Sequence, residues 1–332
     1  MLQGLDERRI QAILSLDAVE SEWLPDLERL VLGSSGLTRH SAGEGAIEAI
    51  QRMLMFLGYS TSASGAFLVD GDFGRGTNRG IAQFQFENRL TAIDRSSLCY
   101  PCQWNNARAR IDAIPEARVD VETLEAMLQK ALAALDSGEI PLGRLEDALF
   151  HLNAVQRGTF LNCRKIQSRY GAAASNAAAH VADETGVEIR PEWILAIIRQ
   201  ETAGVVRPRF EQHVLSRENS RDPETEFSEL RYRSMSIGLG QIMGFNFEHV
   251  GAASARALLF APIEEQVLYV ARFIAQPGIA SSVSTPRPAS TDYRKVAKYY
   301  NGPGYAKHHY HERLERWFNE FVLLRDRGRE VQ

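Results

Sequence analysis

Residues 191–204 read Pro191-Glu-Trp-Ile-Leu-Ala-Ile-Ile-Arg-Gln-Glu-Thr-Ala-Gly204, and this stretch predicts a helix. Proline suits the first helical position, where its missing N–H costs nothing, and glycine suits the end of a helix. Ile194, Ile197 and Ile198 recur at helical spacing and form an apolar stripe, on which Glu201 comes next. The sequence therefore puts one carboxylate at the end of a stripe that faces the core.

A carboxylate in that position is partly desolvated, which favours its protonated form and raises its pKa. A general acid that cuts a glycosidic bond near neutral pH needs a raised pKa of this kind. The alternative is a structural Glu201 paired with an arginine at the helix end, because structural ion pairs perturb pKa values as well. The helix alone leaves both interpretations open.

The composition is that of an ordinary soluble globular protein, with 44% hydrophobic and 24% charged residues. Its 332 residues suffice for two modest domains. A formal net charge of −4 gives no reason to expect a nucleic acid or an anionic membrane as partner. The N-terminus has no basic flank followed by an apolar run, so we expect no signal peptide and a protein made in the cytoplasm.

The N-terminal part predicts a helical lead-in over 1–40 and a helix that ends at Gly58-Tyr59. The run Val69-Asp-Gly-Asp-Phe-Gly-Arg-Gly-Thr77 predicts a tight turn, in which Asp70 and Asp72 bond nearby N–H groups and Phe73 anchors the loop. A second helix follows through Ala-Gln-Phe-Gln85, and Val119-Asp-Val-Glu-Thr123 opens a third. This layout resembles the three-helix peptidoglycan-binding domain of cell-wall enzymes over roughly 45–135. The resemblance implies that four residues of these signatures bind the wall: Tyr59, Asp70, Asp72 and Phe73.

Residues 92–118 depart from that family as a long insertion with Cys99-Tyr-Pro-Cys102. These cysteines have the spacing of half a zinc site, with Cys163 as a conceivable third ligand, but no second pair of ligands accompanies them. We therefore expect reduced thiols in a surface loop and no metal. Three cysteines also fit a reducing compartment better than a disulfide framework. After the third helix, Asp136–Gly143 has linker chemistry, so we expect a domain boundary there.

Three stretches after Glu201 carry further polar chemistry: Phe210-Glu-Gln-His213, Ser234-Met-Ser-Ile-Gly-Leu-Gly-Gln-Ile-Met-Gly244 and Tyr299-Tyr-Asn-Gly-Pro-Gly-Tyr305. Glycines around Leu239 would let backbone approach a ligand, and Gln241 offers a sugar both a donor and an acceptor. Each stretch also has an ordinary explanation. The glycines could serve close helix packing, Tyr300 could be a core residue, and His213 could be a hydrogen-bonding residue at a helix end.

Together with the Glu201 helix, these stretches resemble, over about 180–325, the N-acetylmuramidase domain of modular phage endolysins. Goose-type lysozymes and soluble lytic transglycosylases have a similar set of a Glu, a Gly-Leu-x-Gln and a Tyr-Asn. The resemblance implies that Glu201 is the catalytic acid. We expect Glu211 to be a second catalytic carboxylate. We expect the remaining residues to bind substrate: His213, Ser236, Gly238, Gln241, Tyr300 and Asn301.

We therefore expect a mainly α protein, in which a three-helix peptidoglycan-binding domain precedes a lysozyme-like catalytic domain with a small hairpin between Glu211 and Arg233. The expected divisions are a lead-in over 1–40, a binding domain over 41–137, a helical linker over 138–175 and a catalytic domain over 176–332. The charged segment 216–233 reads as solvated loop. The C-terminal helix carries an apolar face of Leu314, Trp317, Phe318, Phe321 and Leu324. We expect that face to close the catalytic core, although insertion into an anionic membrane is the alternative.

The expected substrate is the peptidoglycan glycan strand, cut between N-acetylmuramic acid and N-acetylglucosamine by a monomer without cofactors. A phage lysis enzyme that waits in the host cytoplasm for release to the periplasm or cell wall fits best, and a secreted interbacterial effector is next. A lytic transglycosylase and a wall-binding or virion protein without activity remain as alternatives.

Overall fold

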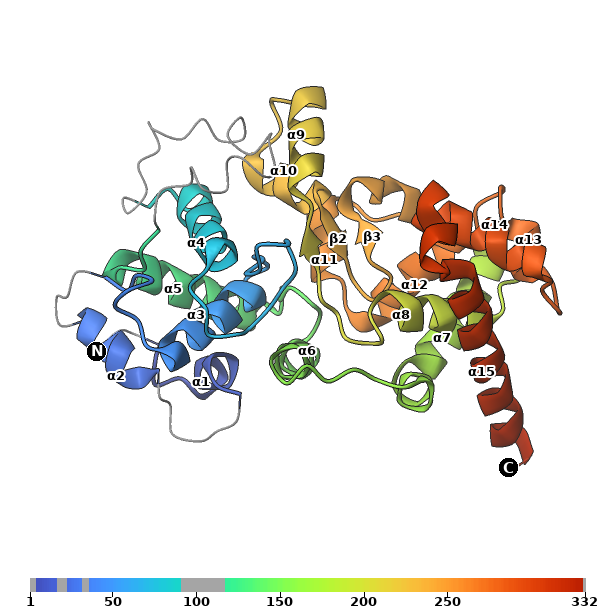
Figure 1. Ribbon diagram of the computed structural model, residues 1–332, viewed down its shortest axis with the longest axis horizontal. Coiled ribbons are helices and arrows are strands. Elements are labelled where there is room, and N and C mark those ends of the chain that lie inside the picture. The colour runs from blue at the N-terminus through green and yellow to red at the C-terminus, as the bar shows by residue number, and fades with distance from the viewer. Residues whose placement is uncertain (1–3, 17–22, 32–35, 91–116, 331–332) are drawn as a thin grey trace.

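The computed structural model describes residues 4–16, 23–31, 36–90 and 117–330. The molecule is elongated, with the N-terminal helices at one end and the C-terminal elements at the other (Figure 1). It is mainly helical, as the sequence predicts. No helix within these ranges is both long and apolar enough to cross a membrane. The predicted insertion at 92–118, with Cys99 and Cys102, lies almost wholly outside the described residues.

Five helices form the N-terminal end: α1 (Arg8–Leu14), α2 (Leu24–Val31), α3 (Glu44–Phe56), α4 (Arg75–Glu87) and α5 (Val121–Ser137). Helices α3, α4 and α5 are the predicted three-helix unit, and the lead-in helices α1 and α2 pack on α3. Asp120 caps α5, because its carboxylate accepts hydrogen bonds from the backbone N–H and the hydroxyl of Thr123. The Val-Asp-x-x-Thr signature therefore has a direct structural cause.

Gln51 of α3 holds the glycine-rich turn before α4. Its side-chain oxygen accepts from the backbone N–H groups of Asp70 and Gly71 at 2.9 and 3.1 Å. Its amide N–H donates to the Asp70 carboxylate at 2.8 Å and to the Asp72 carbonyl at 3.0 Å. One buried amide thus satisfies the polar groups of the turn, which explains how a loop so rich in glycine keeps a single conformation.

Two helices follow the linker, α6 (Leu145–Gln156) and α7 (Cys163–Thr185). The predicted boundary between residues 175 and 176 falls inside α7, which is continuous and packs on α8, α12 and α15 of the C-terminal end. A domain boundary inside an unbroken, packed helix is physically unreasonable. We therefore propose a boundary before α7, in the loop at 157–162.

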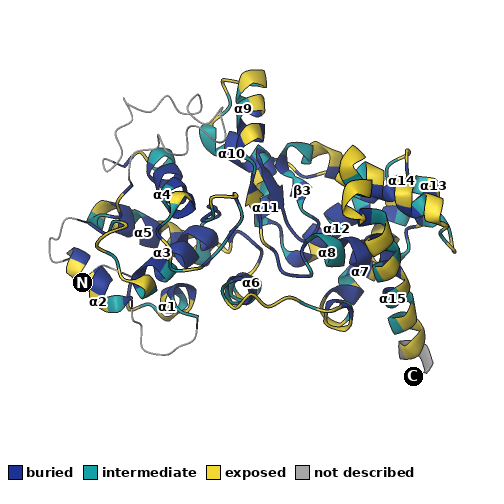
Figure 2. Ribbon diagram, viewed as in Figure 1, coloured by how far each residue is buried: buried dark blue, intermediate teal, exposed yellow. Residues whose placement is uncertain are grey.

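The C-terminal end is built around α8 (Pro191–Glu201), with Pro191 at its first turn. Every residue from Glu192 to Ile198 is buried, so α8 is covered on all sides and not only on the predicted apolar stripe. Figure 2 shows this helix in the dark blue of buried residues at the centre of the lobe. Helices α7, α12 and α15 pack on it. The later helices of this end are α9 (Gln212–Arg221), α10 (Phe227–Arg233), α11 (Ala255–Phe260), α12 (Ile263–Ile274), α13 (Ala280–Ser284), α14 (Ser290–Asn301) and α15 (Tyr310–Glu330).

A small antiparallel sheet contains β1 (Arg209–Phe210), β2 (Met235–Ile237) and β3 (Ile242–Met243) in that order. The expected hairpin between Glu211 and Arg233 is wrong, because that segment forms α9 and α10 and the strands lie outside it. Reading 216–233 as solvated loop is wrong for the same reason. Within this segment Glu218 is buried, and its carboxylate accepts from the half-exposed Arg217 at 3.3 Å.

Helix α15 closes the core of this lobe with Leu314, Phe318 and Phe321, all of which are buried. Trp317 lies at the margin of the face, partly exposed, with its indole N–H donating to Gln200 at 3.2 Å and its ring against the Arg199 guanidinium. The apolar face therefore packs inward as expected, but Trp317 is not its centre.

The two ends of the molecule are bonded to each other. Arg231 of α10 and Glu87 of α4 form a two-pronged ion pair, with nitrogen–oxygen distances of 2.6 and 3.2 Å, and both side chains are buried. The loop at 65–67 lies antiparallel beside β1, because the Phe210 N–H donates to Gly65 O at 2.8 Å and the Phe67 N–H to Pro208 O at 3.2 Å. The N-terminal unit thus extends the small sheet of the C-terminal lobe.

Candidate active site

Glu201 is the last residue of α8, the most enclosed helix of the lobe. Its carboxylate accepts a hydrogen bond from the hydroxyl of Tyr310, the first residue of α15. Burial raises the pKa of Glu201 to about 7, although the Tyr310 hydrogen bond and the positive charge of Arg313 both act in the opposite direction. A carboxyl group with this pKa is partly protonated at neutral pH, as a general acid must be.

The turn between β2 and β3 lies beside this carboxyl group. Thr202, which follows Glu201, donates its hydroxyl hydrogen bond to Leu239 O in that turn at 2.9 Å. Tyr300, at the end of α14, donates to Gly240 O at 2.6 Å, and the Glu201 charge raises the pKa of its hydroxyl further above the value set by burial. The end of α8, the turn and the ends of α14 and α15 therefore meet at one place.

Gly238 and Gly240 are required where the chain approaches its neighbours in this turn. Gly238 has φ +74°, a conformation that favours glycine, and a Cβ on Gly240 would lie only 2.6 Å from the Tyr300 hydroxyl. Gln266 of α12 supports the turn by accepting from the Leu239 N–H at 3.2 Å. The glycines serve close packing of the turn and not an open approach to ligand alone.

Gln241 and Ser236 bond to each other across the same turn. The Ser236 hydroxyl donates to the Gln241 side-chain oxygen at 3.0 Å, and the Gln241 amide N–H donates to Gly238 O at 3.1 Å. Gln241 also has a left-handed backbone, with φ +51°. In this conformation the side-chain oxygen and one amide N–H of Gln241 stabilise the turn. A sugar could therefore bond only to the second N–H and the second lone pair of the oxygen.

Glu211 and His213 stand at the start of α9, directly after β1. The Glu211 carboxylate pairs with the Arg209 guanidinium at 3.0 Å and lies 3.8 Å from the His213 ring, whose side chain is largely exposed. In the described part of the chain no contact joins either residue to Glu201. Asn301, the last residue of α14, is exposed beside Tyr300. The roles of Glu211, His213 and Asn301 therefore stay predictions.

Two contributors to the site were missed in the sequence analysis, Tyr310 and Gln266. Tyr310 does carry a signal, because Tyr310, Leu314 and Phe318 recur every four residues and Tyr310 is therefore the first member of the apolar face of α15. A tyrosine at the start of a core-facing helix needs a partner for its hydroxyl, and Glu201 is that partner. Gln266 gives no such signal.

The predicted wall-binding residues divide into two groups. Tyr59 and Phe73 are buried, at 5% and 4% exposure, and the Tyr59 hydroxyl donates to Glu87 at 2.7 Å. Both rings are therefore mostly covered in this conformation, and wall contact by Tyr59 and Phe73 stays a prediction. Asp70 and Asp72 are both exposed, so both remain available.

Cys163, the third cysteine, is buried at the start of α7, where burial raises the pKa of its thiol to about 12. Among the residues that the structure describes, no group of three or more His, Cys, Asp or Glu side chains could hold a metal ion.

Comparison with known proteins gives two family matches. Residues 225–322 match the N-acetylmuramidase family and residues 43–94 match a peptidoglycan binding domain family. A crystal structure of the Burkholderia AP3 phage endolysin is similar to the chain at 17% identity and a TM-score of 0.35, over 83% of this chain and 95% of that one. No curated protein matches the chain. The N-acetylmuramidase match includes Ser236, Gln241, Tyr300 and Tyr310 but begins after Glu201.

Proposed function

Because the chain has the architecture of modular endolysins, with an N-terminal peptidoglycan-binding domain and a C-terminal N-acetylmuramidase domain, we propose that it cuts the β-1,4 bond between N-acetylmuramic acid and N-acetylglucosamine. The observation that carries the assignment of the acid is Glu201, a carboxyl group with a pKa raised by burial to about 7, at the meeting point of α8, α14, α15 and the β2–β3 turn. Protonated Glu201 gives its proton to the leaving oxygen of the glycosidic bond.

The surroundings of Glu201 favour the state that follows proton transfer. The Tyr310 hydroxyl and the positive charge of Arg313 both stabilise the carboxylate form. Burial acts in the opposite direction and keeps the proton available beforehand. Glu201 therefore keeps its proton near neutral pH until it donates it. The carboxylate that remains is stabilised by the hydrogen bond from Tyr310, which is already in position.

We assign the second catalytic role to Glu211, as the base that activates a water or as a residue that orients the cleft through His213. An inverting hydrolase needs its base about 6.5–9.5 Å from the acid, with room for a water between them. The ion pair of Glu211 with Arg209, and the His213 ring 3.8 Å from the same carboxylate, support a carboxylate held in place. Ser236, Gln241, Tyr300 and Asn301 would then contact the sugars.

A lytic transglycosylase is the second candidate. In that reaction the C6 hydroxyl of the muramic acid attacks, and Glu201 works without a second carboxylate. One observation favours it: in the described part of the chain, the groups that bond to Glu201 or shift its pKa are Tyr310 and Arg313, and neither is a carboxylate.

Mass spectrometry of purified peptidoglycan digested by the full chain separates the two reactions. Hydrolysis leaves reducing muramic ends, whereas transglycosylation leaves anhydro ends lighter by one water molecule. Glu201→Gln, which keeps the shape of the side chain, should lower the rate by ~10²–10⁴-fold in either case. Substantial lysis by a folded Glu201→Gln chain would move the acid elsewhere. An unmodified chain that does not cut peptidoglycan would support a wall-binding or virion protein.

The N-terminal domain would hold the enzyme at the wall and raise the effective concentration of substrate at the catalytic lobe. We propose host lysis at the end of a phage cycle as the biological role, with release from the host cytoplasm to the wall. Secretion as an interbacterial effector is the alternative.

A further inference from the structure

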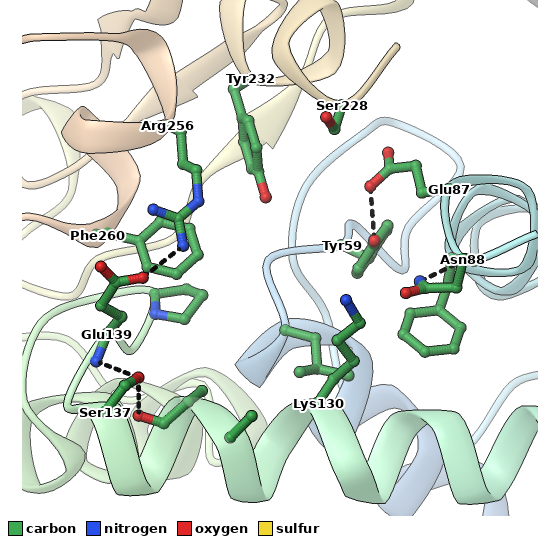
Figure 3. Close-up of a pocket in the computed structure, with 15 residues that line it drawn as sticks. Tyr59, Glu87, Asn88, Lys130, Ser137, Glu139, Ser228, Tyr232, Arg256 and Phe260 are labelled. Carbon is green, nitrogen blue, oxygen red and sulfur yellow. Dashed lines mark hydrogen bonds and ion pairs between the residues drawn. The ribbon is translucent and has the colours of Figure 1, made fainter. Parts of the chain in front are cut away.

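A pocket lies at the junction of the two domains, and Glu201 is not among the residues that line it. Its volume is about 470 Å³, and its walls come from α4, α5, α10, α11 and the segment after α3 (Figure 3). None of its lining residues belongs to the Glu201 cluster. Because both domains contribute side chains, the pocket exists only in the joined molecule.

The junction that forms the pocket is firmly held. Arg231 donates to both oxygens of Glu87 and also to Gly58 O at 2.7 Å, and the Tyr59 hydroxyl donates to the same carboxylate at 2.7 Å. These groups come from α10, α4 and the turn after α3, so the walls of the pocket cannot move apart without breaking a buried ion pair.

Most charges at the pocket are already compensated within the protein. Glu87 is paired with Arg231, and Glu139 is paired with Arg256 at 2.9 Å. Lys130, on the exposed side of α5, has no ion pair with any residue that the structure describes. The pocket therefore has one uncompensated positive charge, which suits an anionic group on a ligand.

Tyr232 adds an unused hydrogen-bond donor. Its side chain is 8% exposed, and its O–H finds no acceptor among the described residues. Figure 3 shows the Tyr232 hydroxyl and the Lys130 ammonium group pointing from opposite domains into the same open space. The rings of Phe84 and Phe260 line the pocket beside them. Because this hydroxyl faces the pocket, it can donate to a ligand carboxylate or carbonyl there.

We propose that this pocket binds a short peptide with a free carboxylate, namely the stem peptide that branches from the glycan strands of peptidoglycan. The carboxylate would lie between Lys130 and Tyr232, and the aliphatic side chains of the peptide would contact Phe84 and Phe260. This proposal rests on the proposed function, because it takes peptidoglycan as the substrate. It adds that the wall is recognised jointly by both domains through its peptide and not only through its sugar.

Titration calorimetry tests the proposal with the full chain and stem peptide released from purified peptidoglycan by an amidase. We expect the unmodified chain to bind the peptide. Lys130→Met should weaken binding by about tenfold or more and Tyr232→Phe by several-fold, since hydrogen bonds to charged groups have contributions of that order. Lys165→Met is the matched control, because Lys165 is an exposed lysine of α7 outside the pocket and loses the same charge.

Competition between glycan strands and the bound peptide is measured with the Glu201→Gln chain, because this variant should not cut the glycan. Glycan strands stripped of their peptides should not displace the bound peptide. The proposal is overturned if the unmodified chain does not bind the peptide, if Lys130→Met binds it as tightly as Lys165→Met does, or if the stripped glycan displaces it. Mass spectrometry of digests keeps the two proposals apart. A chain that cuts the wall but ignores the peptide refutes only the pocket, whereas an uncut wall refutes the proposed function.

Discussion

Tyr310→Phe is the most informative change to the site, because it removes one hydroxyl group and keeps the buried ring. The hydroxyl donates to Glu201 and lowers the pKa of that carboxyl group, which burial raises to about 7. A hydrogen bond to a charged group contributes ~1.5–3 kcal/mol, and one pKa unit corresponds to about 1.4 kcal/mol. Without the hydroxyl, we therefore expect the pKa of Glu201 to rise by about one to two units.

A general acid works only while it is protonated, so activity should fall as the pH rises through the pKa of Glu201. The alkaline limb of the pH–rate profile should lie near pH 7 in the unmodified chain, and about one to two units higher in Tyr310→Phe. The maximal rate should drop about tenfold, because the anion left after proton transfer has lost its donor. The assay is the clearing of purified cell walls at a series of pH values.

Tyr269→Phe is the matched control for this measurement. Tyr269 also donates to a glutamate, Glu265 of α12 at 3.2 Å, but away from the site. Its profile should match that of the unmodified chain. An alkaline limb that stays in place in Tyr310→Phe, or that moves to lower pH, would refute the assignment of Glu201 as the acid with Tyr310 as its positioning residue.

Three further predictions concern the fold. Glu87→Gln should lower the free energy of unfolding by about 3–5 kcal/mol, because it leaves the buried Arg231 guanidinium without a counter-charge; a melting temperature unchanged in calorimetry would contradict this. Burial lowers the pKa of His151 to about 3, so only the unfolded state takes up its proton as the pH falls from about 6.5. Stability should then decrease by up to about 1.4 kcal/mol per pH unit, and urea titrations of His151→Asn should lack that contribution. Phe318→Ala should destabilise the chain by ~3–5 kcal/mol and Trp317→Ala by clearly less, since only the former is fully buried; equal losses in thermal melts would argue against the margin position of Trp317.

The helices and the main features of the site follow from local patterns in the sequence. Pro191 and the isoleucines of α8 predict both the helix and the burial of Glu201 at its end, because spacing along a helix fixes which side chains share a face. Likewise, the Asp120 and Thr123 signature predicts the start of α5 through a hydrogen bond that spans three residues. Local chemistry decides such features, so the sequence is sufficient.

The features that the sequence analysis missed depend on distant partners. Arg231 reads as one charge in a solvated run, but it is buried because Glu87, 144 positions earlier, neutralises it. Tyr310 is bonded to a glutamate 109 positions away. The Tyr59 ring is covered by the guanidinium of Arg231, which comes from the neighbouring domain. In each case the decisive energy comes from a pairing that no local pattern encodes.

The antiparallel contact between Ala66 and Arg209 limits how this protein can be rebuilt from parts. Gly65 has φ +89°, and any side chain there would collide with Phe210 O, so the loop matches this one partner strand. If the C-terminal lobe were produced alone, the edge of β1 would be exposed and the Arg231 guanidinium would have no counter-charge. A chimera that grafts a foreign wall-targeting domain onto this lobe would inherit both defects. A chimera that folds would therefore have to keep the loop at 60–70 and Glu87 of the N-terminal domain joined to the C-terminal lobe.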